Sequence, residues 1–152
     1  MAFAKWRGKL ALVTGSSSGI GVEFAKVLAE AGCHLILTAR RRDRLEALAS
    51  ELKQAHGVQV HVVDADLGSS EGVPRICSFL QENKLDVDIL VNNAGFGAAG
   101  EFHLASPERL AGMIQVNIAS LVALTRSLIN EMRERGSGNI MNVGSVNAFL
   151  PV

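Results

Sequence analysis

The sequence predicts an α/β fold in which five parallel strands form a doubly wound sheet with the order 3-2-1-4-5. Short runs rich in β-branched residues alternate with segments of helical periodicity along the whole chain, and a glycine-rich turn follows the first run. Repeated strand–helix–strand units make right-handed crossovers, which give a parallel sheet with helices on both faces. This strand order places a ligand crevice at the carboxyl ends of strands 1 and 4.

Five short runs have the composition of buried strands, and no linker or internal repeat separates them. They are residues 10–14, 34–39, 58–63, 88–92 and 139–143. Because a helical segment lies between each pair, we expect residues 1–152 to form one domain.

The first two helical segments carry apolar residues at three- and four-residue spacing. In the first, the predicted buried stripe consists of Ile20, Phe24, Val27, Leu28 and Ala31. In the second, it consists of Leu45, Leu48, Ala49 and Leu52. Gly32 and Gly57 follow these stripes, and glycine is favoured just after the end of a helix.

The last two helical segments differ in length. The third has a stripe made of Val73, Ile76, Cys77 and Leu80. The fourth is predicted as one long helix over 106–135, with Ser106 as its N-cap and Pro107 at its first position. Its apolar residues cover about half of its circumference, more than the ~100° that packing on a sheet requires. We therefore expect an apolar face that the sheet does not cover.

Composition restricts the partners and the compartment. Fifteen basic and fifteen acidic residues give a formal net charge of zero, so no global attraction to nucleic acid or to an anionic membrane is expected. No run approaches the ~18 consecutive apolar residues of a membrane span. Cys33 and Cys77 stand far apart, and the four histidines have no ligand spacing. We expect a cytoplasmic protein with reduced thiols and no metal.

The glycine-rich turn TGSSSGIG covers residues 14–21. Gly15, Gly19 and Gly21 allow a tight turn, close approach to a pyrophosphate, and close packing of the following helix on the strand. The helix N-terminus then offers free N–H groups to phosphate. A tight turn without a ligand is the alternative, but the position between a strand and a helix favours dinucleotide binding.

The end of the second strand indicates which dinucleotide binds. A carboxylate there would select NAD by binding the ribose hydroxyl, whereas this chain has Arg40 followed by two more arginines. A guanidinium binds the 2′-phosphate of NADP in a forked geometry. A solvated basic loop is the alternative and suits Arg42 and Arg44, while Arg40 is assigned to the phosphate. Nucleic-acid binding is disfavoured because no aromatic residue interleaves with the arginines.

Five motifs occur in a characteristic order: TGSSSGIG, DADL, NNAG, the asparagine of IQVNIAS, and NIMNVGS. In this order and spacing the chain resembles the short-chain dehydrogenase/reductase family, from about residue 8 to the last residue. The segments LILTARRRDRLEALASEL and NNAGFGAAGEF are similar to its NADP-dependent branch. The resemblance implies a Rossmann-type fold, the cofactor NADP, and a small-molecule carbonyl or alcohol substrate.

The resemblance also implies a role for each matching residue. The cofactor-binding set consists of Gly15, Gly19 and Gly21 at the diphosphate; Ser16, Ser17, Ser18 and Ile20 on the adenosine side; Asp66 at the adenine; Asn92 closing the site beside strand 4; and Ala94 and Gly95 against the ribose. Asn117 would hold the proton-relay water, and Ser145 would hold the substrate oxygen. The glycine-rich segment FGAAGEF is left open as a substrate contact.

The family's proton donor is a tyrosine, assisted by a lysine one helical turn later. Counted from Ser145, both positions fall beyond Val152, and the sequence contains no tyrosine. We therefore expect residues 1–152 to be the dinucleotide-binding portion of a longer single-domain reductase, truncated at its C-terminus and inactive alone. The complete protein is expected to form a dimer or tetramer through helix 106–135.

Two alternatives remain. A non-catalytic NADP(H)-binding module or sensor would need the same glycine-rich turn but no tyrosine. Another nucleotide-binding enzyme, such as a methyltransferase, is disfavoured by NNAG and by the three-residue gap between Gly15 and Gly19. Sugars, steroids, fatty-acyl carbonyls and xenobiotic ketones all remain open as substrates.

Overall fold

The computed structural model describes residues 4–98 and 100–145, and their core is a five-stranded parallel sheet. The strands are β1 Leu10–Thr14, β2 His34–Ala39, β3 Val60–Asp64, β4 Ile89–Asn92 and β5 Asn139–Asn142. Their order is β3-β2-β1-β4-β5, which confirms the predicted topology. β1 lies at the centre, and all five of its residues are buried.

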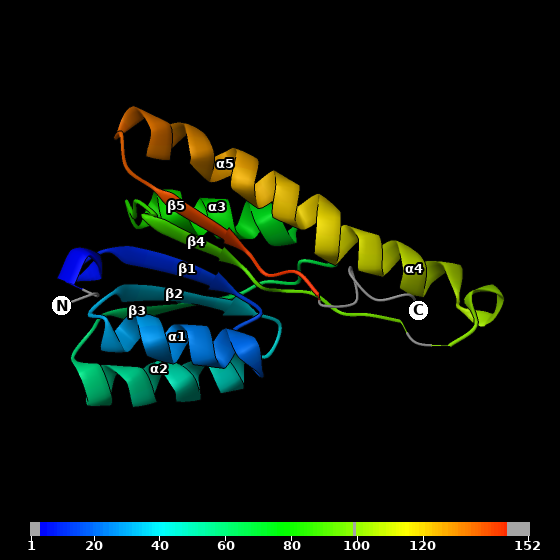
Figure 1. Ribbon diagram of the computed structural model, residues 1–152, viewed down its shortest axis with the longest axis horizontal. Coiled ribbons are helices and arrows are strands. Elements are labelled where there is room, and N and C mark those ends of the chain that lie inside the picture. The colour runs from blue at the N-terminus through cyan, green and yellow to red at the C-terminus, as the bar shows by residue number, and fades with distance from the viewer. Residues whose placement is uncertain (1–3, 99, 146–152) are drawn as a thin grey trace.

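Helices cover both faces of the sheet (Figure 1). α1 (Ile20–Glu30) and α2 (Arg42–His56) lie on one face, and α3 (Gly72–Glu82) and α5 (Leu121–Glu134) lie on the other. Two hydrophobic clusters, one under each helix layer, fill the space between helices and sheet. The predicted stripe of α2 is fully buried, and its helix ends at Gly57 with a left-handed φ of 67°.

The predicted buried stripe of α1 is wrong at two of its positions. Ile20 and Val27 are 62% and 50% exposed, while Gly21, Ala25 and Ala29 face the core. These residues have little or no side chain, so the helix backbone can approach the sheet closely, and the larger Phe24 and Leu28 pack at its flank. Small residues therefore mark the buried face of α1, and the spacing of its larger apolar residues does not.

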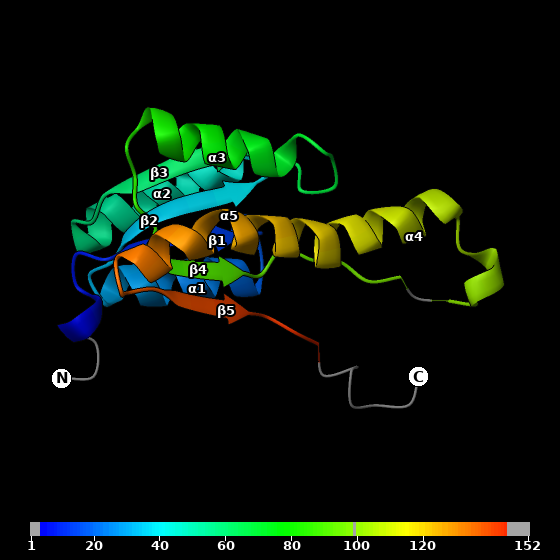
Figure 2. The same ribbon diagram turned by 90° about the horizontal axis from the view of Figure 1, so that it is seen from above.

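The predicted long helix is interrupted. α4 (Pro107–Ile114) and α5 are joined by a π-helical turn, η3 (Gln115–Ser120). The predicted N-cap is confirmed, since Ser106 Oγ accepts a hydrogen bond from Arg109 N (3.2 Å). α4 extends beyond the sheet, away from the helix layers (Figures 1 and 2).

Much of the apolar surface of this helical segment is exposed. Leu124, Leu128 and Met132 are buried against the sheet. Exposed are Ile114, Ile118, Val122 and Ile129. By length and composition alone, the segment Pro107–Glu134 is apolar enough to cross a membrane, and 17% of its most apolar stretch is buried. The sequence prediction, which looked for an unbroken apolar run, did not identify this segment, because polar residues separate its apolar residues.

The amino ends of β1 and β4 are joined by polar contacts. Asp88 accepts hydrogen bonds from Lys9 Nζ and from the backbone N of Leu10, both at 3.0 Å. Nearby, the short helix η1 (Ala4–Trp6) places Trp6 against the core, with Lys5 Nζ 4.6 Å from its ring centre. The buried Cys33 thiol donates to the Trp6 carbonyl (3.3 Å), and burial, followed by the nearby Asp88, raises the pKa of that thiol.

Candidate functional site

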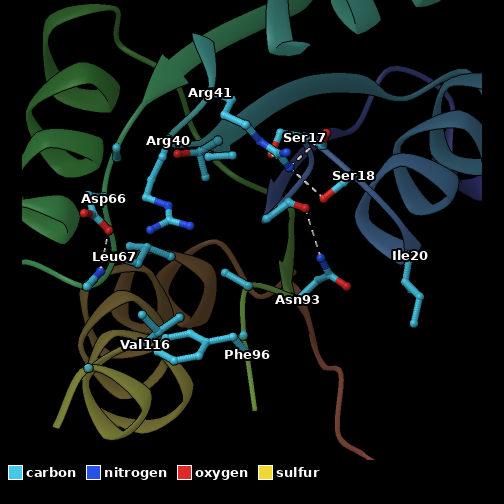
Figure 3. Close-up of a pocket in the computed structure, with 18 residues that line it drawn as sticks. Ser17, Ser18, Ile20, Arg40, Arg41, Asp66, Leu67, Asn93, Phe96 and Val116 are labelled. Atoms are coloured by element: carbon cyan, nitrogen blue, oxygen red, sulfur yellow. Dashed lines mark hydrogen bonds between the residues drawn. The ribbon is translucent and has the colours of Figure 1, made fainter. Parts of the chain in front are cut away.

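A cavity of about 500 Å³ opens at the carboxyl ends of β1, β2 and β4 (Figure 3). This is the predicted crevice, and its volume lies within the range of small-molecule and cofactor sites. Its lining is Gly15, Ser17, Ser18, Ile20, Thr38, Ala39, Arg40, Arg41, Ala65, Asp66, Leu67, Gly68, Asn93, Ala94, Gly95, Phe96, Gly112 and Val116. Eight predicted cofactor-binding residues belong to it: Gly15, Ser17, Ser18, Ile20, Arg40, Asp66, Ala94 and Gly95.

The glycine-rich turn approaches the loop after β4 closely. A Cβ atom on Gly15 would lie 2.8 Å from the Ala94 Cα, and one on Gly21 would lie 2.6 Å from Asn93 Nδ2. Gly19 has a φ of 58°, and a Cβ there would meet nothing within 4 Å. Gly15 and Gly21 therefore permit the packing of two loops, while Gly19 supplies a left-handed conformation beside open space.

Thr14 ties these two loops together, and the sequence prediction did not include it. Its Oγ1 accepts from the backbone N of Asn93 and of Ala94, both at 2.9 Å, and donates to the Val91 carbonyl (3.2 Å). Asn93 Nδ2 returns a hydrogen bond to the Thr14 carbonyl (2.9 Å). A threonine at the last position of a strand, directly before the first glycine, was the available sequence signal.

The three consecutive arginines have three different environments. Arg40 extends from the end of β2 into the cavity, and within the described part of the chain it makes no hydrogen bond or ion pair (Figure 3). Arg41 contacts the glycine-rich turn, with its Nη2 2.8 Å from Ser18 Oγ. Arg42 is the first residue of α2 and not a loop residue as predicted, and it pairs with Glu46 (2.7 Å) and Asp64 (3.0 Å) at the surface.

Asp66 lies on the opposite side of the cavity from the glycine-rich turn (Figure 3). Its Oδ1 accepts a hydrogen bond from Gly68 N (2.9 Å), which orients the carboxylate at the exposed rim. Beside it, Leu67, Phe96 and Val116 give this part of the wall an apolar surface. A flat ligand group with polar edges suits such a wall.

Four predicted cofactor-binding residues lie outside the lining. Ser16 is buried with its Oγ 3.4 Å from the Thr38 carbonyl, Gly19 directly precedes α1, and Gly21 lies in the first turn of α1. Asn92 is also buried, and its Nδ2 donates to Thr125 Oγ1 (3.0 Å) and Asn142 Oδ1 (2.9 Å). The geometry therefore gives Asn92 a role in joining β4, β5 and α5.

The two predicted catalytic residues also lie outside the lining. Asn117 sits in the π-helical turn, where its Oδ1 accepts from Phe96 N (3.1 Å) and its Nδ2 donates to the Phe96 carbonyl (2.9 Å). The Asn117 side chain thus fixes the loop that carries Phe96. Ser145 is an exposed residue that follows β5, on the same sheet edge as the cavity.

The cavity residues fit a ligand that carries phosphate. The turn around Gly15 and Gly19 leaves space at the start of α1, where backbone N–H groups favour an anion. Thr38 Oγ1, buried in the cavity wall, has no hydrogen-bond partner among the described residues. Arg40 directly follows β2, the strand that contains Thr38, and its guanidinium supplies positive charge to the cavity.

The family profile described as short chain dehydrogenase matches residues 9–152. The chain belongs to this family. The membership confirms the resemblance that the five motifs indicated. It also accounts for the sheet order, since the family's solved structures superpose on this chain over nearly its full length.

Several short-chain dehydrogenases illustrate the similarity. The uncharacterised oxidoreductase YvaG of Bacillus subtilis is 38% identical over 146 residues, which are 95% of this chain and 54% of that protein. The human very-long-chain 3-oxoacyl-CoA reductase is 34% identical and matches 95% of this chain and 47% of its own length. This chain therefore spans about half the length of the curated relatives that it matches.

Solved structures give the same picture. L-sorbose reductase from Gluconobacter frateurii, complexed with NADPH and L-sorbose, superposes with a TM-score of 0.93 at 38% identity, covering 100% of this chain and 57% of that one. A short-chain dehydrogenase from Sphingobium yanoikuyae in complex with NADPH gives 0.88 at 36% identity, with coverages of 94% and 56%.

Proposed function

We propose that this chain is the dinucleotide-binding part of an NADP-dependent oxidoreductase, which transfers a hydride between the nicotinamide and a small-molecule carbonyl or alcohol. The observation that carries the proposal is that one cavity is lined both by a glycine-rich turn and by Arg40. Among the described residues, Arg40 has no hydrogen-bond or ion-pair partner. No carboxylate lines the cavity at the end of β2, where one would select NAD. Relatives solved with NADPH support the choice of cofactor.

The chain's own residues would bind and orient the cofactor. The turn around Gly15 holds the diphosphate, Arg40 binds the 2′-phosphate, and Asp66 binds the adenine edge. When bound, the cofactor supplies or accepts the hydride. Asn117 and Ser145 are proposed to act at the substrate end, where Ser145 stabilises the charge that develops on the substrate oxygen.

Replacing Arg40 tests this proposal. Arg40→Ala should weaken NADP⁺ binding by about one to two orders of magnitude, because a charge-assisted hydrogen bond contributes ~1.5–3 kcal/mol. NAD⁺ lacks the phosphate and should bind almost as before. Calorimetric titration of both nucleotides measures the two affinities, and Arg44→Ala, in the same basic segment but outside the cavity, is the control. An equal loss for both nucleotides would return Arg40 to the class of solvated loop residues.

A non-catalytic NADP(H)-binding module is the second candidate, because the glycine-rich turn and Arg40 serve cofactor binding whether or not a hydride is transferred. Both candidates share the cavity and the cofactor, so binding does not separate them. We expect residues 1–152 alone to bind NADPH without oxidising it in the presence of any carbonyl compound. The reductase is favoured if a longer protein that includes the family's tyrosine and lysine oxidises NADPH. It is favoured further if Ser145→Ala abolishes this turnover and retains the affinity for NADP⁺.

The assembly and the compartment are part of the same proposal. The apolar face of α4, η3 and α5 is proposed to pack against a second copy of the protein. The same segment packs Leu124, Leu128 and Met132 on the sheet and buries Ser120, whose Oγ donates to the Leu67 carbonyl (2.7 Å). These contacts favour a helix of a cytoplasmic protein over a membrane span, although its length and composition alone would allow one.

A further inference from the structure

The second arginine after β2 holds the glycine-rich turn. Arg41 Nη2 donates to Ser18 Oγ (2.8 Å) and to Ser17 Oγ (3.0 Å), and Nε approaches the same Ser17 Oγ (3.3 Å). All three residues line the cavity, and Figure 3 shows the guanidinium directed at the two hydroxyls. One planar group therefore connects the end of β2 to two residues that precede α1.

These contacts determine which hydrogen bonds the hydroxyls of Ser17 and Ser18 can still donate. A serine hydroxyl that accepts from a guanidinium still has its own proton to donate. Neither Ser17 nor Ser18 donates that proton to any described residue, and Arg41 Nη1 likewise has no described acceptor. Together, Ser17, Ser18 and Arg41 thus present two O–H groups and one NH₂ group to further acceptors.

Apart from one lone pair that remains on Ser18 Oγ, these groups are hydrogen-bond donors, and such a set of donors suits a phosphate monoester. Such a phosphate carries nearly two negative charges and three acceptor oxygens at neutral pH. Arg40 adds a second positive charge to the same wall of the cavity. A ribose hydroxyl is neutral and itself needs an acceptor for its proton, so it gains much less from this arrangement.

We propose that Arg41 is a positioning residue for the 2′-phosphate of NADP. Its hydrogen bonds to Ser17 Oγ and Ser18 Oγ leave the two hydroxyl protons available to that phosphate. Arg41 thereby contributes to the preference for NADP over NAD. This inference rests on the proposed function and extends it, since the phosphate had been assigned to Arg40 and Arg41 had no role. The two arginines then act differently, Arg40 by its own charge and Arg41 through the turn.

Calorimetric titration of NADP⁺ and NAD⁺ against a small set of variants tests this role. Arg41→Gln should weaken NADP⁺ by about 10- to 100-fold and NAD⁺ by less than about threefold. Arg41→Lys should recover only part of the loss, because one ammonium cannot span two hydroxyls as the fork does. In a Ser17→Ala/Ser18→Ala background, Arg41→Gln should cost less than about threefold, since residues that act together are not additive. Arg44→Gln, which removes an equal charge outside the cavity, should change neither affinity.

The outcomes are distinguishable. Equal losses of NADP⁺ and NAD⁺ in Arg41→Gln, full recovery by Arg41→Lys, or additive effects with the serine variants would each overturn the positioning role. If Arg41→Gln does not fold, the test is the ratio of the NADP⁺ affinity to the NAD⁺ affinity in the double variant Ser17→Ala/Ser18→Ala. A ratio equal to that of the wild type overturns the positioning role. A wild-type chain without preference for NADP⁺ would instead refute the proposed function, and this inference with it.

Discussion

Single side chains decide how well the cavity is preorganised. Thr14 is 1% exposed, and one hydroxyl serves two backbone donors and one backbone acceptor. Asn93 Nδ2 adds hydrogen bonds to the carbonyls of Thr14 (2.9 Å) and Gly15 (3.4 Å). The position of Ala94 and Gly95 in the cavity wall therefore depends on Thr14.

Thr14→Val should destabilise the protein by about 2–4 kcal/mol, because it leaves the half-buried N–H groups of Asn93 and Ala94 without their acceptor. Thr14→Ser keeps the hydroxyl and should cost only about 1 kcal/mol, the value of one buried methyl group. Urea denaturation of both variants measures the difference. Equal losses would show that packing, not the hydrogen bonds, is what Thr14 contributes.

The arginines show the limit of prediction at this scale. The absence of a carboxylate after β2 was visible in the sequence, and Arg40 lines the cavity, while its contact with the 2′-phosphate stays a prediction. The contact of Arg41 with Ser17 and Ser18 could not be predicted, because it depends on how two turns distant in sequence face each other. The buried hydroxyl of Thr38 was equally hidden, since a threonine in a strand has no sequence feature that marks it as unpaired.

At the scale of elements, the order of strands was predictable and the detail of helices was not. Alternating periodicity and the handedness of crossovers restrict the sheet to doubly wound orders, and the structure has the expected order 3-2-1-4-5. The π-helical turn was missed because its residues, such as Val116 and Ile118, continue the same apolar spacing as the flanking helices. Such turns often occur at functional sites, and this one contains Asn117, which binds the backbone of Phe96.

The contact between β1 and β4 gives a prediction about acid stability. Burial alone would raise the pKa of Asp88, but hydrogen bonds from Leu10 N and Lys9 outweigh it and hold the pKa below its usual value. A carboxylate whose pKa is lower in the folded state stabilises the fold fully above its unfolded pKa of about 3.9. That stability is lost as the pH falls through the folded value.

We therefore expect Asp88→Asn to lower the free energy of unfolding at pH 7 by about 1–2 kcal/mol. The variant should also lose less stability than the wild type when the pH falls from 5 to 3. Asp86→Asn is the matched control, because Asp86 is an exposed partner of Arg135 at 3.4 Å and surface pairs contribute little. Denaturant titrations across this pH range test both statements, and parallel curves for Asp88→Asn and wild type would contradict them.

At the scale of the whole molecule, the most unusual surface is the helical segment that extends beyond the sheet. Ile114, Ile118 and Val122 are each more than half exposed on it. Contiguous exposed apolar side chains mark interaction surfaces. The proposed partner is a second copy of the same protein.

Placing charges on this face should reduce self-association. Ile118→Lys/Val122→Lys removes two apolar contacts per copy, each worth about 1.5–3 kcal/mol when buried, so the dissociation constant should rise at least about a hundredfold. Ala47→Lys, on the exposed face of α2, is the control. Sedimentation velocity over a concentration series measures the effect, and an unchanged distribution would show that another face makes the contact.

The placement of Trp6 determines what fluorescence can report about this protein. The sequence has one tryptophan and no tyrosine, so ultraviolet emission comes almost entirely from one indole. Trp6 precedes β1, whereas the cavity opens after it, so the length of a five-residue strand, about 16 Å, separates them. A change in indole emission therefore follows the amino edge of the sheet, beside Lys5 and the Cys33 thiol. Filling of the cavity is better followed through the light absorbed by the nucleotide itself.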